Sequence, residues 1–175
     1  MSSIRSFVPV LICAASIAAI GCSKHAPQSP SAAPAKSALA ESYWLAAAPA
    51  GAIPVVAARE RSKDGEPIVV TGRVKDFVDG LAAFTIVDAS LPSCAEGGDM
   101  KECETPWDYC CTDPAAVQRA SASVEIHDAN GIVTTDVRGF HGLDHLKPVT
   151  VAGTAKRDAA GNLTVLAASL NVSGG

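Results

Sequence analysis

The sequence predicts an all-β domain, a small closed or partly open β-barrel of five to six strands that carries a cysteine-rich insertion. Three observations lead to this prediction. Six runs after residue 66 have the spacing of apolar and polar residues that is typical of strands. Two of these runs have a glycine at their centre. Four cysteines fall within eighteen residues, in a stretch without periodicity that needs a cross-link of its own to be ordered.

The six strand-like runs are separated by recognisable turns. An Asp79-Gly80 turn joins the first two runs into a hairpin, and an Asn130-Gly131 turn joins the third run to the fourth. A further turn at residues 160–162 joins the last two runs. The runs are residues 68–75, 83–88, 121–128, 132–138, 149–155 and 163–172.

The last run contains a change of face. Leu163 and Val165 lie on one face of an extended chain, whereas Leu170 and Val172 lie on the other, because the two pairs are an odd number of residues apart. A shift of one residue predicts a β-bulge or a strand that is buried on both faces.

Gly72 and Gly153 each occupy the middle of a run of the form V-x-G-x-V/A. A glycine in this position weakens an ordinary sheet, but it permits the sharp bend and close backbone approach that a closed barrel needs. With the hairpin order of the runs and a short turn at residues 142–147, residues 68–172 resemble an OB-fold barrel. An extended run and a turn replace the helix that usually lies between the third and fourth strands. A small β-sandwich is the alternative architecture.

The chain divides into three parts. Its 175 residues allow one modest domain and a tail. Residues 1–22 have the short apolar run of an export signal and end in A-I-G-C, which resembles a bacterial lipobox. We expect lipid on Cys22 to hold the protein on the periplasmic or cell-surface side of a membrane, whereas an ordinary signal peptide would release it. Residues 23–65, rich in Ala, Pro and Ser, predict a flexible tether, and residues 66–175 the barrel domain.

Cysteines are concentrated in the insertion at residues 91–118. Two disulfides are the simplest interpretation for an exported protein. Because a bond between the neighbours Cys110 and Cys111 would be strained, Cys94 and Cys103 should each pair with one of them, and both pairings stay open. A Zn²⁺ site of four thiolates is an alternative, although the spacing differs from paired C-x₂₋₄-C motifs. An easily reduced bond within the adjacent pair is a third interpretation.

The segment T-P-W-D-Y-C-C at residues 105–111 resembles a signature of small exported lipoproteins from planctomycete-type bacteria. The resemblance extends to GRV at residues 72–74, AFTIVDASLPSC at residues 83–94 and HGLDHLKPVTVAG at residues 141–153. It implies the OB-like fold, export and the cysteine cluster, and it implies no activity.

Four further residues are candidates for ligand or metal contacts. Trp107 and Tyr109 either stack on a base or a sugar or cap the barrel end against the cysteine bridges. His141 and His145 are four apart, which in a helix would place both imidazoles on one face as a metal-binding pair. The alternative for the histidines is a polar turn between extended segments.

Charge limits the classes of partner. The whole chain has a formal charge of −4, and from residue 65 onward eight Lys and Arg stand against fifteen Asp and Glu, a balance of −7. Nucleic acid is therefore not an expected partner unless Arg73 and nearby basic residues form a local patch. Arg73 is also a candidate ligand contact.

Known catalytic motifs are absent from the sequence: there is no G-x-S-x-G, HExxH, phosphate-binding glycine loop or dinucleotide fingerprint. The expected function is a non-catalytic binding or interaction module that is attached to a membrane by its lipid. Its expected partner is an envelope protein or a glycan. No cofactor is expected, with Zn²⁺ as the alternative.

Overall fold

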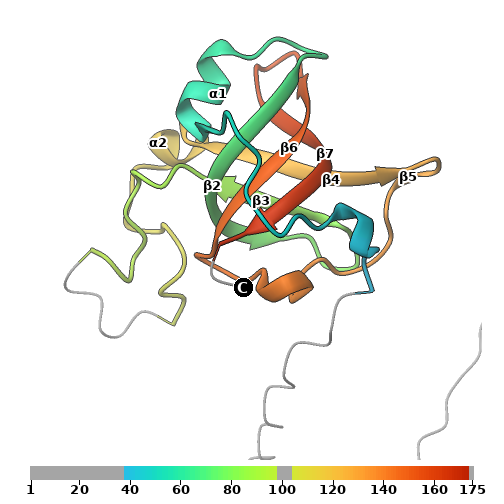
Figure 1. The fold of residues 1–175 in the computed structure, drawn as a ribbon. Helices are drawn as coiled ribbons and strands as arrows, with labels where there is room; N and C mark the ends of the chain where they lie inside the picture. The colour runs from blue at the N-terminus through green and yellow to red at the C-terminus, as the bar shows by residue number, and fades with distance from the viewer. Residues whose placement is uncertain (1–37, 98–103, 174–175) are drawn as a thin grey trace, which may run out of the picture. The chain divides into compact units, whose positions relative to one another are not determined.

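Five strands close into a barrel in the computed structural model of the chain, which describes residues 38–97 and 104–173 (Figure 1). The barrel strands are β2 (Pro67–Phe77), β3 (Ala83–Val87), β4 (Ser121–Asp128), β6 (Pro148–Arg157) and β7 (Leu163–Val172). They pair in the order β2-β3-β4-β7-β6, and β6 also pairs with β2, which closes the sheet. Within the barrel, β4 and β7 are parallel and the other pairs are antiparallel. The predicted all-β, OB-like barrel is therefore confirmed.

Short elements surround the barrel strands. Strand β1 (Ile53–Pro54) pairs in parallel with β2, and β5 (Gly131–Ile132) pairs with the end of β4. The helical elements are η1 (Glu41–Tyr43), α1 (Val55–Arg61), α2 (Pro114–Arg119) and η2 (Phe140–Gly142), where η denotes a 3₁₀ turn. None of the helices in the described part of the chain is long and apolar enough to cross a membrane.

The two glycines at strand centres lie where the backbone of one strand approaches its neighbour. A Cβ atom on Gly72 would be 2.7 Å from the carbonyl oxygen of Val87 in β3, and one on Gly153 would be 2.1 Å from that of Leu166 in β7. Strand β2 bends at this point, because its first half pairs with β6 and its second half with β3. The close approach expected from the sequence is thus confirmed.

The change of face in β7 is a β-bulge. Ala152 pairs with Ser169 and the next residue, Gly153, pairs with Ala167, so Ala168 has no counterpart in β6. Ala168 is exposed, whereas Ala167 before it and Leu170 after it are buried in the main core. The bulge inferred from the sequence is confirmed at this position.

The predicted strand at residues 132–138 is wrong over most of its length. Only the first residue of that run pairs with β4, as part of β5. The chain then turns inward, and Val137 and Phe140 are buried in the main core. Gly139, with a φ of +86°, supplies the left-handed conformation that this turn requires. The apolar spacing here came from a loop that inserts side chains into the core.

The predicted tether at residues 23–65 is also wrong from residue 38 onward. Leu39, Val55 and Ala58 belong to the main core, and the last two are fully buried. Helix α1 is fixed to the barrel because the Asp88 carboxylate, at the end of β3, accepts a hydrogen bond of 2.9 Å from the Val56 amide. Tyr43, Trp44 and Ile53 of the same segment also pack against the main core. The folded domain thus includes residues 38–65, and residues 23–37 lie outside the described residues, as does the predicted signal and lipobox at residues 1–22.

The apolar interior has two parts. The main core fills the barrel, and its largest fully buried side chains are Phe84, Ile86, Ile126, Leu143, Leu163 and Leu170. A second cluster, here called the insertion core, lies outside the barrel under the cysteine-rich insertion. It consists of Val87, Tyr109 and Ala120, with Leu91, Val117 and Leu146 packed against it. The insertion therefore has an apolar base of its own.

Candidate functional site

Two basic side chains of β2 hold the two described parts of the insertion, here called the first arm (residues 91–97) and the second arm (residues 104–113). Arg73 Nη1 lies 2.7 and 2.8 Å from the two carboxylate oxygens of Glu96, and Arg73 Nη2 donates to the carbonyl oxygen of Leu91. Lys75 Nζ lies 3.4 Å from the carboxylate of Asp108 on the other arm. The Arg73 side chain is only 13% exposed. The structure therefore places Arg73, a candidate ligand contact in the sequence, underneath the insertion, where it positions the loop.

Glu96 is held in its charged form. The hydrogen bond from Arg73, with further bonds from the Ser93 amide and hydroxyl at 2.8 and 3.0 Å, lowers the pKa of Glu96 to about 2. The first arm of the insertion is thus fixed by charge-assisted hydrogen bonds over the whole physiological pH range.

Tyr109 anchors the second arm by burial. Its side chain is in the insertion core, and the residue is 2% exposed. Burial raises the pKa of Tyr109, and the nearby Arg73 cation acts in the opposite direction. At this level of burial the ring of Tyr109 packs in the insertion core and is not exposed for stacking on a base or a sugar.

Trp107, in contrast, forms the wall of a pocket. Its ring stacks on the imidazole of His145, with centroids 5.0 Å apart and planes at 25°. The other neighbour of the imidazole is Phe77, in an edge contact at 5.2 Å. His145 Nδ1 lies 2.8 Å from the carbonyl oxygen of Lys75, so Nδ1 carries a proton and donates it. His145 Nε2, without a partner among the described residues, is left to interact with a ligand.

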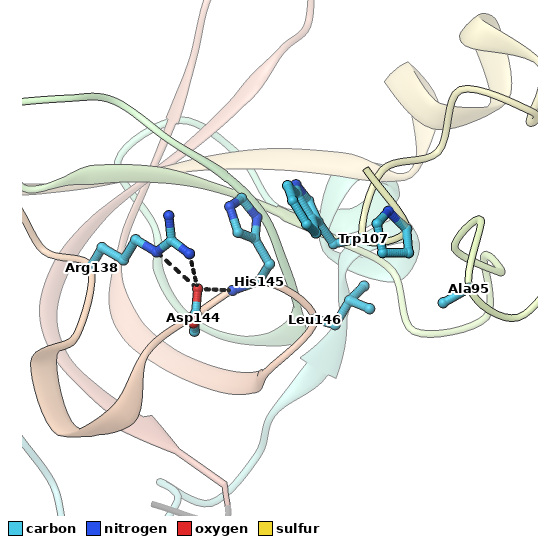
Figure 2. Close-up of a pocket in the computed structure, with 7 residues that line it drawn as sticks. Ala95, Trp107, Arg138, Asp144, His145 and Leu146 are labelled. Carbon is cyan, nitrogen blue, oxygen red and sulfur yellow. Dashed lines mark hydrogen bonds and ion pairs between the residues drawn. The ribbon is translucent and has the colours of Figure 1, made fainter. Parts of the chain in front are cut away.

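An ion pair lies on the side of His145 away from Trp107 (Figure 2). Arg138 Nε and Nη2 are both 2.9 Å from Asp144 Oδ1, which also accepts the His145 amide at 2.8 Å. The Arg138 guanidinium lies 5.7 Å from the ring centroid of Phe77. Asp144 Oδ2 has no partner within the described part of the chain. The pair thus keeps both an acceptor and donors available to a ligand.

The cavity between these groups has a volume of about 300 Å³. It lies between the insertion, which supplies one wall, and the loop that leads into β6, which supplies the other. Its lining residues are Ala95, Pro106, Trp107, Arg138, Asp144, His145 and Leu146. A concave site with an aromatic wall and a few polar groups is the usual form of a small-ligand pocket.

The loop wall of the pocket is fixed to β2 by backbone hydrogen bonds. The Leu146 amide donates to Val74 O at 2.8 Å, and the Val74 amide donates to Lys147 O at 3.0 Å. Leu146 has a φ of +62°, a left-handed conformation that costs a residue with a side chain about 1–2 kcal/mol. The hydrogen bonds and the burial of Leu146 against the insertion core offset this cost, so that the adjacent His145 is held in place.

Three cysteine thiols of the insertion cluster beside the pocket. Cys94 Sγ lies 3.2 Å from Cys110 Sγ, Cys110 Sγ lies 3.8 Å from Cys111 Sγ, and all three sulfur atoms are within 4.8 Å of one another. No disulfide joins these three sulfur atoms to one another, and Cys94 is buried whereas Cys110 and Cys111 are exposed. Cys103 lies outside the described residues.

Hydrogen bonds make the thiols of this cluster unequal. Bonds from the Cys110 thiol and from the backbone amides of Cys111 and Cys110 lower the pKa of Cys94. The hydrogen bonds with Cys94 and Cys111 raise the pKa of Cys110 to about 12. Cys94 is therefore the thiol that ionises most readily within the pair.

The two histidines do not form the metal pair considered from the sequence. His141 Nε2 lies 2.6 Å from the carboxylate of Glu41, and its ring stacks on Trp44 with centroids 4.0 Å apart. His145 has the different partners described above. The helical spacing is not formed, because η2 is a single 3₁₀ turn in which His141 has a φ of +44°. Of the two histidines, only His145 lines the pocket, whereas His141 contacts Glu41 and Trp44.

Comparisons with known proteins give no indication of the function. No model of a protein family matches the chain, and a search of curated proteins finds no similar one. Sequence reasoning singled out Trp107 and His145, but for separate roles. It did not indicate Arg138 or Asp144, because neither belongs to a spacing that a recognised site requires.

Proposed function

We propose that the protein is a lipid-anchored, extracytoplasmic, non-catalytic binding module whose ligand is a glycan of the cell envelope. The observation that carries this proposal is the pocket in which the Trp107 and His145 rings lie beside the Arg138–Asp144 pair. OB-type barrels bind oligosaccharides as well as oligonucleotides, so the fold is compatible with either ligand.

The chemistry of the pocket favours a sugar. The apolar face of a pyranose ring packs against an indole, as other flat apolar surfaces do. Sugar hydroxyls both donate and accept, and the pocket offers matching groups in Asp144 Oδ2, the Arg138 guanidinium and His145 Nε2. A volume of about 300 Å³ suits one or two sugar rings and is too small to enclose a folded protein partner.

Charge disfavours nucleic acid at the same place. The domain has an excess of seven acidic over basic residues from residue 65 onward. Two of the basic residues that might have contacted phosphate, Arg73 and Lys75, are paired with Glu96 and Asp108. The remaining local charge does not attract a polyanion.

Binding to a sugar is tested through the intrinsic fluorescence of Trp107. The chain has two tryptophans, so the Trp44→Phe variant leaves Trp107 as the sole reporter. We expect titration with an N-acetylglucosamine trisaccharide to shift Trp107 emission saturably, and calorimetry on the wild type to give the same affinity. Asp144→Ala should weaken binding by roughly ten- to a hundredfold, because one hydrogen-bonded charged group contributes about 1.5–3 kcal/mol. Arg119→Ala, on the exposed helix α2, is the matched control and should bind like the wild type.

Two results would contradict this function. One is unchanged affinity in both Asp144→Ala and Trp107→Ala, which would remove the pocket as the site. The other is tight, salt-sensitive binding of a single-stranded oligonucleotide together with no response to the sugar.

The lipid anchor rests on the sequence and is tested separately. We expect the wild type to be found in the membrane fraction and Cys22→Ser in the soluble extracytoplasmic fraction, because the thiol that accepts the lipid is gone. A wild type that is fully soluble after export would show that an ordinary signal peptide is removed instead.

A second candidate function, zinc binding, is supported by the three thiols within 4.8 Å of one another. Elemental analysis of protein purified without added metal tests it. A stoichiometric metal that is lost in Cys94→Ala would favour this function.

A further inference from the structure

We propose that Cys94 and Cys110 form a disulfide bond that holds Trp107 against His145, so that the pocket is complete only when the insertion is oxidised. Its consequence for sugar affinity rests on the proposed function. The bond and the position of Trp107 do not.

The geometry selects this pair among the three described cysteines. The two sulfur atoms are 3.2 Å apart, and a disulfide requires about 2.05 Å, so a movement of roughly 1.2 Å closes the bond. The backbones are already side by side, since the Cys94 amide donates to Asp108 O and the Ala95 amide to Pro106 O, each at 2.8 Å. Cys110 and Cys111 are 3.8 Å apart and would have to close a strained ring between neighbours.

The chemistry balances with an external disulfide as oxidant, such as oxidised glutathione or an oxidised dithiol protein. The exposed Cys110 sulfur attacks this reagent as its proton passes to the Cys94 thiolate 3.2 Å away, which forms a mixed disulfide and releases one reagent thiol, and Cys94 then gives that proton to solvent. The Cys94 thiolate then attacks the Cys110 sulfur and releases the second reagent thiol. Cys94 and Cys110 together lose two electrons and two protons, and the reagent gains both.

The bond would act directly on the pocket wall. Trp107 is three residues before Cys110, and Ala95, which also lines the pocket, directly follows Cys94. Without the bond, the second arm is held by two backbone hydrogen bonds, the partly exposed Lys75–Asp108 pair and the burial of Tyr109. Exposed ion pairs hold a loop weakly, whereas a covalent link between the arms fixes the ring that Trp107 presents.

The first experiment maps the bond in the full chain, exported and purified with free thiols blocked at lysis. We expect a non-reducing digest to give a cross-linked peptide pair that contains Cys94 and Cys110. The pair should be lost in Cys94→Ala and in Cys110→Ala and retained in Cys111→Ala, the matched control. A Cys94–Cys111 or Cys110–Cys111 link, or a bound metal with Cys94 and Cys110 free, would overturn the inference.

The second experiment follows the pocket in the Trp44→Phe background. Reduction with dithiothreitol should move Trp107 emission toward that of a solvated indole and weaken binding of the trisaccharide by about tenfold. The double variant Cys94→Ala/Cys110→Ala should behave like reduced protein whether or not reductant is present. Circular dichroism on each sample separates this local change from unfolding, and reduction of the wild type serves if the double variant does not fold.

The two proposals fail in different ways. Equal sugar affinity in the oxidised and reduced protein, with unchanged Trp107 emission, refutes the redox dependence and leaves the glycan function standing. A mapped bond with redox-dependent emission, but no sugar binding in either state, supports the bond and refutes the glycan function.

Discussion

Gly153→Ala should destabilise the domain more than its size suggests. The new Cβ would lie 2.1 Å from Leu166 O, where ordinary contact begins at about 3.4 Å, so β6 and β7 must separate locally by ~1.3 Å. That separation is enough to break the flanking hydrogen bonds of the bulge, and the neighbouring residues leave no room for a rotation to avoid it. Two lost bonds with buried, unpaired groups and the remaining overlap cost about 3–5 kcal/mol.

Urea denaturation and thermal denaturation, both followed by far-ultraviolet circular dichroism, measure this cost. For a domain of this size each kcal/mol lowers Tm by about 3–5 °C, so Gly153→Ala should lower it by at least about 10 °C. The control is Gly97→Ala, whose Cβ would meet its nearest atom, Cys94 O, at an ordinary 3.7 Å. If Gly153→Ala unfolds at the same urea concentration as the wild type with an unchanged slope, the close approach of β6 to β7 is not a constraint, and the explanation of the glycine is wrong.

Three further predictions concern the attached segment and the charged groups. Val55→Ala should cost on the order of 2 kcal/mol in thermal denaturation, whereas the adjacent Val56→Ala, at 37% exposure, should change stability by less than about 0.5 kcal/mol; a flexible tether would give no effect for either. Burial alone would raise the pKa of Asp88, but hydrogen bonds from Val56 and Ser90 outweigh it and lower the pKa. Stability from Asp88 is therefore present above the unfolded pKa near 4 and lost as pH falls below it, and Asp88→Asn should flatten this part of the stability profile. Carbon-13 NMR should show Glu96 titrating at about 2 in the wild type and clearly higher in Arg73→Gln, and equal midpoints would show that the pair does not form in solution.

The barrel was predictable because its strands have one face in the core and the other in solvent or against a neighbouring element. Period-two alternation follows from that geometry, and it located β2, β4 and β6 closely. The bulge in β7 was visible for the same reason, since a shifted register moves side chains from one face to the other. The strand predicted at residues 132–138 failed because Val137 and Phe140 enter the core from a loop, and spacing alone does not distinguish the two.

The candidate site was only partly predictable. The concentration of cysteines indicated the insertion, and the presence of two aromatic residues beside them indicated Trp107 as a candidate contact. The stacking of Trp107 on His145 depends on contacts between two loops that β2 aligns, and no local pattern records such a contact. The same limit explains why residues 38–65 were predicted to be part of a tether. Nothing in the sequence around Leu39 and Val55 indicates that the barrel buries them.

Attachment of residues 38–65 to the barrel sets how far the pocket can travel from a bilayer. With lipid on Cys22, fifteen residues lie between this cysteine and Ala38, the first described residue of the domain. At roughly 3.3–3.6 Å per residue, a fully extended segment of this length spans at most about 55 Å. If the unattached segment had continued to residue 65, its maximum span would have been more than twice as great. If the proposed lipid anchor and glycan ligand are right, the pocket stays within a thin layer next to the membrane, and a sugar chain must enter that layer to be bound.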